Sequence, residues 1–90
     1  MSIAEEIRRR LETLAPQRLE LVDESARHAG HAGARPGGNT HWRLVIASPA
    51  FAGKPTVARH RMVYEALGDL MNAPIHALAI TARAPGEPGA

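Results

Sequence analysis

The sequence predicts a small α+β fold in which helices cover one face of a three-stranded mixed sheet. Two segments carry apolar residues at helical spacing. Three shorter runs indicate strands: the first by its alternation, the second by its branched and aromatic residues, and the third by its continuous apolar character. Their order is helix, strand, strand, helix, strand. The first two strands form an antiparallel hairpin, and the strand–helix–strand segment from Thr40 to Ala82 has the length of a right-handed crossover between parallel neighbours.

The first helix begins at a capping box, because Ser2 is followed three residues later by Glu5 and each side chain can bond the other residue's amide. Pro16 ends this helix, since a proline ring does not fit in a helix interior. One face of the helix is apolar and consists of Ile3, Ile7, Leu11 and Leu14.

The first strand is predicted over Arg18–Ser25, where Leu19 and Leu21 lie on one face. The other face carries Glu20, Val22 and Glu24. Residues 26–39 consist mainly of Gly, Ala, His and Pro and predict a loop. At about fourteen residues this loop exceeds the usual hairpin connection, and loops of that length are commonly functional or disordered.

The second strand is predicted over Thr40–Ser48 and is closed by Pro49, and Phe51 is expected to plug the core. A second helix follows from Thr56 to about Asn72, and Pro74 stops it. Its buried stripe is predicted as Val63, Ala66, Leu67, Leu70 and Met71. The third strand, Ile75–Ala82, is apolar throughout, which is typical of an inner strand of a covered sheet.

Residues 1–84 are expected to form one domain, and the Pro- and Gly-rich residues 85–90 a flexible tail. The chain contains no cysteine, which excludes a disulfide framework and a self-sufficient iron–sulfur site. Its first residues are too polar for a signal peptide, and no apolar run approaches the length of a membrane span. We therefore expect a cytoplasmic protein that does not enter a membrane.

The five histidines are the most informative feature, because histidine is the commonest metal ligand. If the second and third strands are parallel, Thr40 and Ile75 begin at the same edge of the sheet, where the hairpin loop also ends. The histidines expected at this end are His28, His31, His41 and His76. His60 lies early in the second helix, at the opposite end.

At the shared end, His41 is expected to support the site rather than to bind metal. His76 and one of the two loop histidines then make only half a site, because a closed structural zinc site needs four ligands. We therefore expect a metal centre that another molecule completes. A weaker alternative is a stand-alone zinc site of His28, His31 and His76.

A second candidate surface lies at the start of the second helix and consists of Lys54, Arg59, His60 and Arg61. Cations beside helix N-terminal amides suit a phosphate backbone. The formal net charge is only +2, which gives modest support to nucleic-acid binding.

No catalytic constellation stands out. The sequence has no nucleophile elbow, no Walker loop and no paired-carboxylate motif. Asp23 and Ser25 lie near His28, but the end of a strand beside a loop orders a catalytic group poorly. We expect a protein that is not an enzyme.

The chain resembles the BolA family over residues 3–85. The segments that carry this resemblance are Val22–Ser25, His28 with the loop that follows, Thr40–Trp42, Ser48–Gly53, Arg59–Tyr64 and Ile75–Leu78. Several separate motifs in the same order make it specific. It implies a fold of the class II KH type without the G-x-x-G clamp between helices.

The resemblance also implies a partner and a cofactor. BolA-like proteins pair with monothiol glutaredoxins and bridge a [2Fe–2S] cluster, for which the glutaredoxin cysteine and glutathione supply two ligands. The family's C-terminal histidine ligand falls on His76. The second ligand lies in the hairpin loop: His31 has the greater reach between glycines, and His28 follows the Asp-Glu-Ser run more closely.

The same resemblance leaves an alternative function open, since some BolA proteins are described as transcription regulators that bind DNA. Here that role would use the basic start of the second helix. On its own the chain is expected to be a monomer or a weak homodimer.

Overall fold

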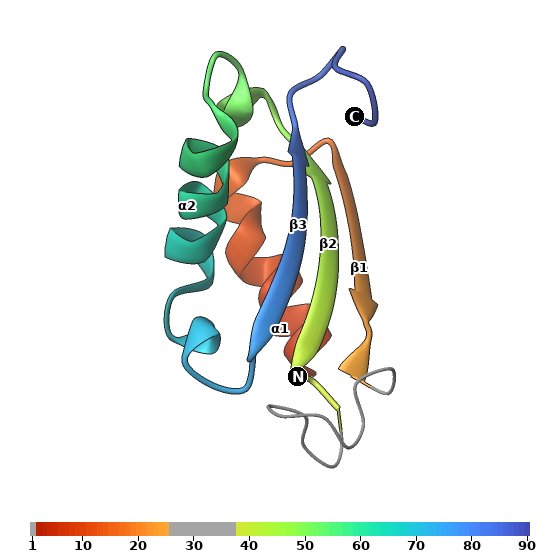
Figure 1. Ribbon diagram of the computed structural model, residues 1–90, viewed down its shortest axis with the longest axis vertical. Coiled ribbons are helices and arrows are strands. Elements are labelled where there is room, and N and C mark those ends of the chain that lie inside the picture. Colours follow the sequence, from red (N-terminus) through yellow and green to blue (C-terminus); the bar gives the residue numbers. More distant parts are fainter. Residues whose placement is uncertain (1, 26–37) are drawn as a thin grey trace.

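The computed structural model describes residues 2–25 and 38–90 of the chain. Within them it contains helices α1 (Ile3–Leu11) and α2 (Thr56–Leu67) and strands β1 (Arg18–Asp23), β2 (His41–Ala47) and β3 (Ala77–Arg83). Both helices lie on the same side of the sheet (Figure 1). The predicted α+β fold and the order of its elements are confirmed.

The central strand of the sheet is β2, which pairs with β1 antiparallel and with β3 parallel. Leu44 in β2 lies opposite Leu21 on one side and Ile80 on the other. The predicted hairpin and the predicted parallel crossover are therefore both present. As a result β2 and β3 begin at the same end of the sheet.

The prediction that the third strand is an inner strand was wrong, because β3 forms an edge of the sheet. Its side chains alternate between two environments: Leu78 and Ile80 pack against the core, whereas Ala77 and Ala79 are exposed. The exposed positions hold small apolar residues. The run therefore looks continuously apolar although only one face is covered.

The core lies between the sheet and the two helices. Phe51 fills it as predicted and has no exposed surface. It ends a 3-10 turn over Pro49–Phe51, which begins where the Ser48 hydroxyl accepts a hydrogen bond from the Ala50 amide. The other large buried side chains are Ile7, Leu11, Trp42, Leu44, Ile46, Val63, Leu67, Leu70 and Ile75.

The first helix starts with the predicted capping box but is shorter than predicted. It ends at Leu11, and a 3-10 turn carries the chain on to Leu14. Ala15 then adopts a left-handed conformation with φ 47°, so the helical run stops before Pro16. The Ser48 hydroxyl donates a hydrogen bond to the Leu14 carbonyl and ties this turn to the end of β2.

The second helix also ends earlier than predicted, at Leu67. Gly68 follows with φ 55° and ψ −127°, a conformation that favours glycine, and a 3-10 turn then runs to Met71. Of the predicted stripe, the buried members are Val63, Leu67 and Leu70, and the half-buried ones are Ala66 and Met71. Neither described helix is long and apolar enough to cross a membrane.

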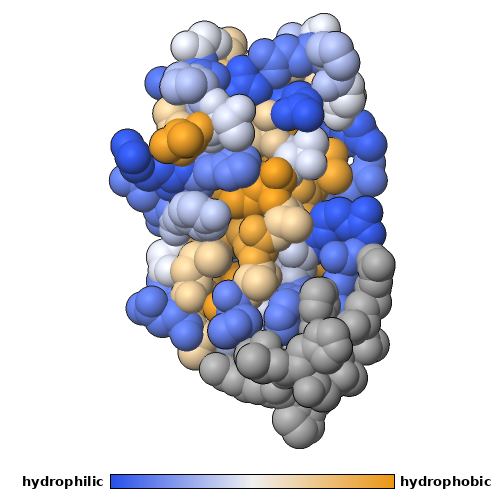
Figure 2. All heavy atoms as spheres, viewed as in Figure 1, coloured by the Kyte–Doolittle hydropathy of each residue, from blue (hydrophilic) through white to orange (hydrophobic). Residues whose placement is uncertain are grey.

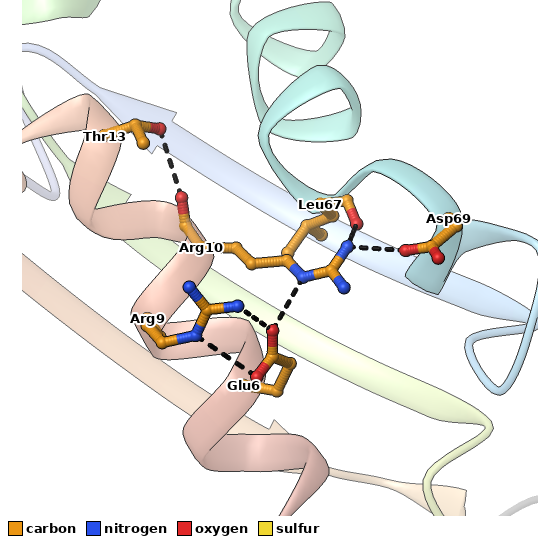
Figure 3. Close-up of polar contacts among 6 residues, drawn as sticks. All are labelled: Glu6, Arg9, Arg10, Thr13, Leu67 and Asp69. Carbon is orange, nitrogen blue, oxygen red and sulfur yellow. Dashed lines mark hydrogen bonds and ion pairs between the residues drawn. The ribbon is translucent and has the colours of Figure 1, made fainter.

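One arginine joins the two helices. The Arg10 guanidinium, from α1, donates to the Leu67 carbonyl at 2.7 Å and to the Asp69 carboxylate at 2.6 Å (Figure 3). It also donates to Glu6 at 2.9 Å, and Arg9 binds the same carboxylate. Hydrogen bonds from Arg9 and Arg10 lower the pKa of Glu6 to about 2.

Candidate metal centre

Two of the histidines meet where β2 and β3 begin, at the lower end of the sheet in Figure 1. The Thr40 carbonyl accepts hydrogen bonds from the amides of His76, at 2.7 Å, and of Ala77, at 3.0 Å. His41 is the register partner of Ala77. The parallel pairing therefore brings His41 and His76 together.

The two imidazole rings have different surroundings although their centroids are only 5.5 Å apart. The side chain of His76 is exposed, whereas His41 is 8% exposed. Nδ1 of His41 lies 3.0 Å from the Thr40 hydroxyl oxygen. His76 is thus the ring that presents itself to another molecule, and His41 packs behind it with the planes inclined by 54°.

Ser25 organises this end of the sheet. Its buried hydroxyl oxygen accepts hydrogen bonds from the amide of Thr40 at 2.9 Å and from the amide of His41 at 3.1 Å. The Thr40 hydroxyl donates to the same oxygen at 3.2 Å. The Thr40 hydroxyl oxygen thus lies between the Ser25 oxygen, at 3.2 Å, and Nδ1 of His41, at 3.0 Å.

Asp23 fixes the two ends of the hairpin connection to each other. Its carboxylate accepts the amide of Ser25 at 2.9 Å and the amide of Asn39 at 3.2 Å. Partial burial by itself raises the pKa of Asp23, but hydrogen bonds from Ser25 and the Asn39 amide outweigh it, so the net pKa is lowered. Gly38 has φ 80°, and a Cβ there would lie 3.0 Å from this carboxylate.

His28 and His31, the two candidate loop ligands, lie outside the described residues. Of the three predicted metal ligands, the structure therefore places His76. Among residues 2–25 and 38–90, no group of three or more His, Cys, Asp or Glu side chains is arranged to hold a metal ion. Within the described residues, the candidate site therefore consists of the exposed imidazole of His76, against which the ring of His41 packs.

The predicted basic surface is smaller than expected, because Arg59 does not belong to it. Arg59 is 8% exposed, and its guanidinium donates to both carboxylate oxygens of Glu87, at 2.6 and 2.8 Å. Lys54 and Arg61 are exposed and His60 is half-buried. The sequence correctly indicated a cation at Arg59. Its partner Glu87 lies 28 residues further along the chain, so local sequence could not show that the charge is paired.

The Arg59–Glu87 pair also anchors the last residues. Glu87 accepts the amide of Ala84 at 2.8 Å, and Arg59 donates to the Ala82 carbonyl at 3.0 Å. The hydrogen bonds from Arg59 and Ala84 lower the pKa of Glu87 to about 2. Residues 85–90, predicted as a flexible tail, thus contact the domain in the structure, and Arg18 adds a hydrogen bond to the Gly89 carbonyl.

The sequence did not reveal Ser25 and Thr40 as the supports of the histidine pair. A usable signal was present, since each hydroxyl lies at one end of the long Gly- and His-rich connection, where small polar side chains often bond nearby amides. Their actual bonds join residues 15 apart. Only the tertiary structure brings these groups together.

Comparison with known proteins shows what the chain is similar to. The family described as "BolA-like protein" matches residues 11–87. An uncharacterized protein in the cobS 5′ region of Sinorhizobium sp is 46% identical over 90 residues, covering 98% of this chain and 97% of its own. Human BolA-like protein 1 is 44% identical over 76 residues, covering 84% of this chain and 53% of its own.

The chain thus spans almost all of the first relative but about half of the second. Among solved structures, the BolA domain of SufE1 from Arabidopsis thaliana superposes with a TM-score of 0.81 at 42% identity. That match covers 94% of this chain and 95% of the domain. The family match over residues 11–87, the identity to these relatives and the superposition on a BolA domain all lead to the same conclusion: the chain belongs to the BolA-like protein family.

Proposed function

We propose that this protein is a non-enzymatic iron–sulfur adaptor that pairs with a monothiol glutaredoxin and shares a [2Fe–2S] cluster with it. Its own ligands are His76 and one of the loop histidines, His28 or His31. The glutaredoxin cysteine and a glutathione supply the remaining two. Family membership and the exposed histidine support the proposal.

The observation that carries the proposal is the exposed ring of His76. It lies at the end of the sheet where β2 and β3 begin, next to Thr40, which follows the hairpin connection. A neutral imidazole fits the cluster, since imidazole replaces thiolate on one iron of Rieske centres and raises the reduction potential. The described residues offer no complete ligand set. A half site of this kind suits a cluster whose other ligands belong to a partner.

The chain's own contribution is to hold the ligand in place. The main chain of His76 is fixed to Thr40, whose hydroxyl in turn positions His41 against the His76 ring. A supported ligand ring loses little conformational freedom on binding, which favours a defined geometry in the heterocomplex.

The test is to mix the protein with a monothiol glutaredoxin, iron, sulfide and glutathione and to record the visible absorption and circular dichroism. We expect a heterocomplex whose spectrum differs from that of the glutaredoxin homodimer. His76→Ala should abolish the difference, whereas His60→Ala, at the other end of the sheet, should leave it intact. An unchanged spectrum in the His76 variant would exclude the proposal.

The loop ligand is decided by the same experiment. His28→Ala and His31→Ala are compared side by side, and the variant with the altered spectrum identifies the second ligand. Retention of zinc through dialysis by the protein alone, lost in both loop variants, would favour the stand-alone zinc site instead.

DNA binding is the competing function, and it is tested by salt-dependent affinity for duplex DNA. It has less support than its sequence pattern suggested, because Arg59 is paired with Glu87. Lys54, His60 and Arg61 remain, and few neutralised phosphates mean low affinity at physiological salt. Binding weakened by Arg61→Ala and unaffected by His76→Ala would support a regulator that contacts DNA.

A further inference from the structure

The outer edge of β3 carries backbone groups that face away from the sheet. Ala77 donates its amide to Thr40, and Arg83 accepts the amide of Ser48, so these β3 residues bond inward to β2. In a strand the bonding direction alternates, and Ala79 and Thr81 bond inward as well. The N–H and C=O groups of the intervening residues, Leu78, Ile80 and Ala82, therefore point outward.

The upper part of this edge is already occupied. Arg59, on α2, donates to the Ala82 carbonyl at 3.0 Å. Within the described part of the chain, no side-chain or loop hydrogen bond reaches the outward groups of Leu78 or Ile80. The N–H donors and C=O acceptors of Leu78 and Ile80 thus remain available on this stretch of the β3 edge.

The two edges of the sheet differ in how they discourage pairing with another chain. β1 carries Arg18, Glu20 and Asp23, and charges on an edge strand oppose strand addition. β3 carries no charge from Ala77 to Ala82. The edge formed by β1 is thus protected by its charges, whereas the edge formed by β3 resembles a strand that pairs with a partner.

Apolar side chains accompany the open edge. Figure 2 shows them gathered over β3 and over the space between β3 and α2. Met62 and Ala66 on α2, and Leu78 and Ile80 on β3, are only partly buried. A segment added beside β3 would cover this apolar surface on the helix side.

The position of α2 limits what fits. Arg59 bridges from α2 to the edge carbonyl of Ala82, so the helix lies within one side-chain length of the edge. A second copy paired edge to edge about a two-fold axis would place its own α2 on the same side of the sheet, beside this α2 at the shared edge. A single extended segment needs only the strand spacing of about 4.8 Å.

We propose that the β3 edge from Ala77 to Thr81 takes an extended, uncharged segment of the partner protein, which adds as a fourth strand. The inference rests on the proposed function for the identity of that partner. His76 directly precedes β3, so a segment paired with Leu78 and Ile80 places the rest of the partner beside the exposed imidazole. Backbone pairing then supplies affinity, and the cluster ligands supply the chemistry.

The probe is a purified monothiol glutaredoxin without cluster, titrated into the full chain. We expect the amide protons of Leu78 and Ile80 to exchange quickly in the free protein and slowly in the complex. Ile80→Pro removes one outward N–H without touching the bonds to β2, and losing it should weaken binding about tenfold or more.

The matched control is Leu21→Pro. Leu21 occupies the equivalent outward position on β1, and its side chain also packs on the core, so the cost to the fold is similar. Its binding should equal that of the parent. If a proline variant does not fold, Ala79→Lys tests the same edge with an exposed charge, and Val22→Lys on β1 is its control.

The outcomes separate this inference from the proposed function. Parent-like binding by both Ile80→Pro and Ala79→Lys, or absence of any complex, overturns strand addition at β3. A dimer of this chain that Ile80→Pro dissociates overturns the choice of occupant. If Ile80→Pro abolishes binding while His76→Ala leaves the cluster spectrum unchanged, the docking edge stands and the proposed ligand role fails.

Discussion

At the scale of single residues, the histidine end of the molecule depends on one hydroxyl group. The oxygen of Ser25 accepts two amides and a hydroxyl from Thr40 and His41, in a position where Ser25 itself is 5% exposed. Water cannot replace a buried acceptor without rearrangement of the strand ends. The order of the His41 and His76 pair therefore depends on Ser25.

Ser25→Ala should destabilise the fold by about 1–3 kcal/mol, because it leaves buried donors of Thr40 and His41 without their acceptor. Urea unfolding measures the loss, and faster exchange of the two amides locates it. Thr13→Ala is the control, since it removes an exposed hydroxyl that bonds the Arg10 carbonyl. Equal stability of the Ser25 and Thr13 variants would contradict the role assigned to Ser25.

At this scale the sequence named candidate residues, but it did not predict their environments. His76 is exposed and stays a predicted ligand, and His28 and His31 stay predictions as well. The burial of His41 and of Arg59 was not predictable from local sequence. Each depends on a partner distant in the chain, such as Glu87 for Arg59.

At the scale of elements, the side chain of Arg10 in α1 joins the two helices by binding the C-terminal end of α2. Arg10 binds the carbonyl of Leu67, the last residue of α2, and the carboxylate of Asp69 in the turn that follows (Figure 3). The turn that follows leads to Ile75 and His76. By fixing the end of α2, Arg10 therefore also fixes the start of the segment that leads to the candidate ligand His76.

Arg10→Leu should lower the melting temperature by several degrees, because the Leu67 carbonyl and the Asp69 carboxylate lose their common donor. Arg9→Leu is the matched control in the same helix. It removes only an exposed pair with Glu6 and should change the melting temperature by about one degree. If Arg9→Leu lowered the melting temperature more than Arg10→Leu, Arg10 would not be the residue that holds the two helices together.

The apolar pattern predicted every α-helix and strand of the described fold, but neither the 3-10 turns nor where the α-helices end. α2 stops early at Gly68, which has a positive φ, whereas α1 passes after Leu11 into a 3-10 turn that ends at the left-handed Ala15. The pattern also misplaced β3, because small residues such as Ala77 and Ala79 look alike on a covered face and on an exposed one. Periodicity reports burial of large side chains and says little about edges.

At the scale of the whole molecule, the two ends of the sheet have different roles. The end where β2 and β3 begin presents His76. The end where they stop is tied together by Arg59, which links α2, the Ala82 carbonyl and Glu87. The tie removes one arginine from the basic surface and leaves the lower part of the β3 edge uncovered by it.

This tie should be sensitive to acid. Hydrogen bonds from Arg59 and Ala84 lower the pKa of Glu87 from 4.5 to about 2. A lowered carboxyl pKa means that the pair stabilises the fold fully above the ordinary value and that this contribution is lost as pH falls towards the lowered value. Glu87 should therefore stay ionised at about pH 3.5, where an ordinary glutamate is mostly protonated.

Carbon-detected NMR of the Glu87 carboxyl group measures this directly. The chemical shift should hardly change between neutral pH and about pH 3.5 in the parent. In Arg59→Gln the titration should move up towards the ordinary range. A parent titration centred at the ordinary value would show that the pair does not persist in solution.

The bonds around Ser25 and Asp23 have a consequence for how this protein can change. They fasten residues 23–25 to residues 39–41, so the frame around His76 is complete before the chain between them is considered. Closing a longer connection costs little, about 0.6 kcal/mol for each doubling of its length. The connection between them can thus be exchanged by evolution or by an engineer, and with it the proposed second ligand, without rebuilding the strand ends that present His76.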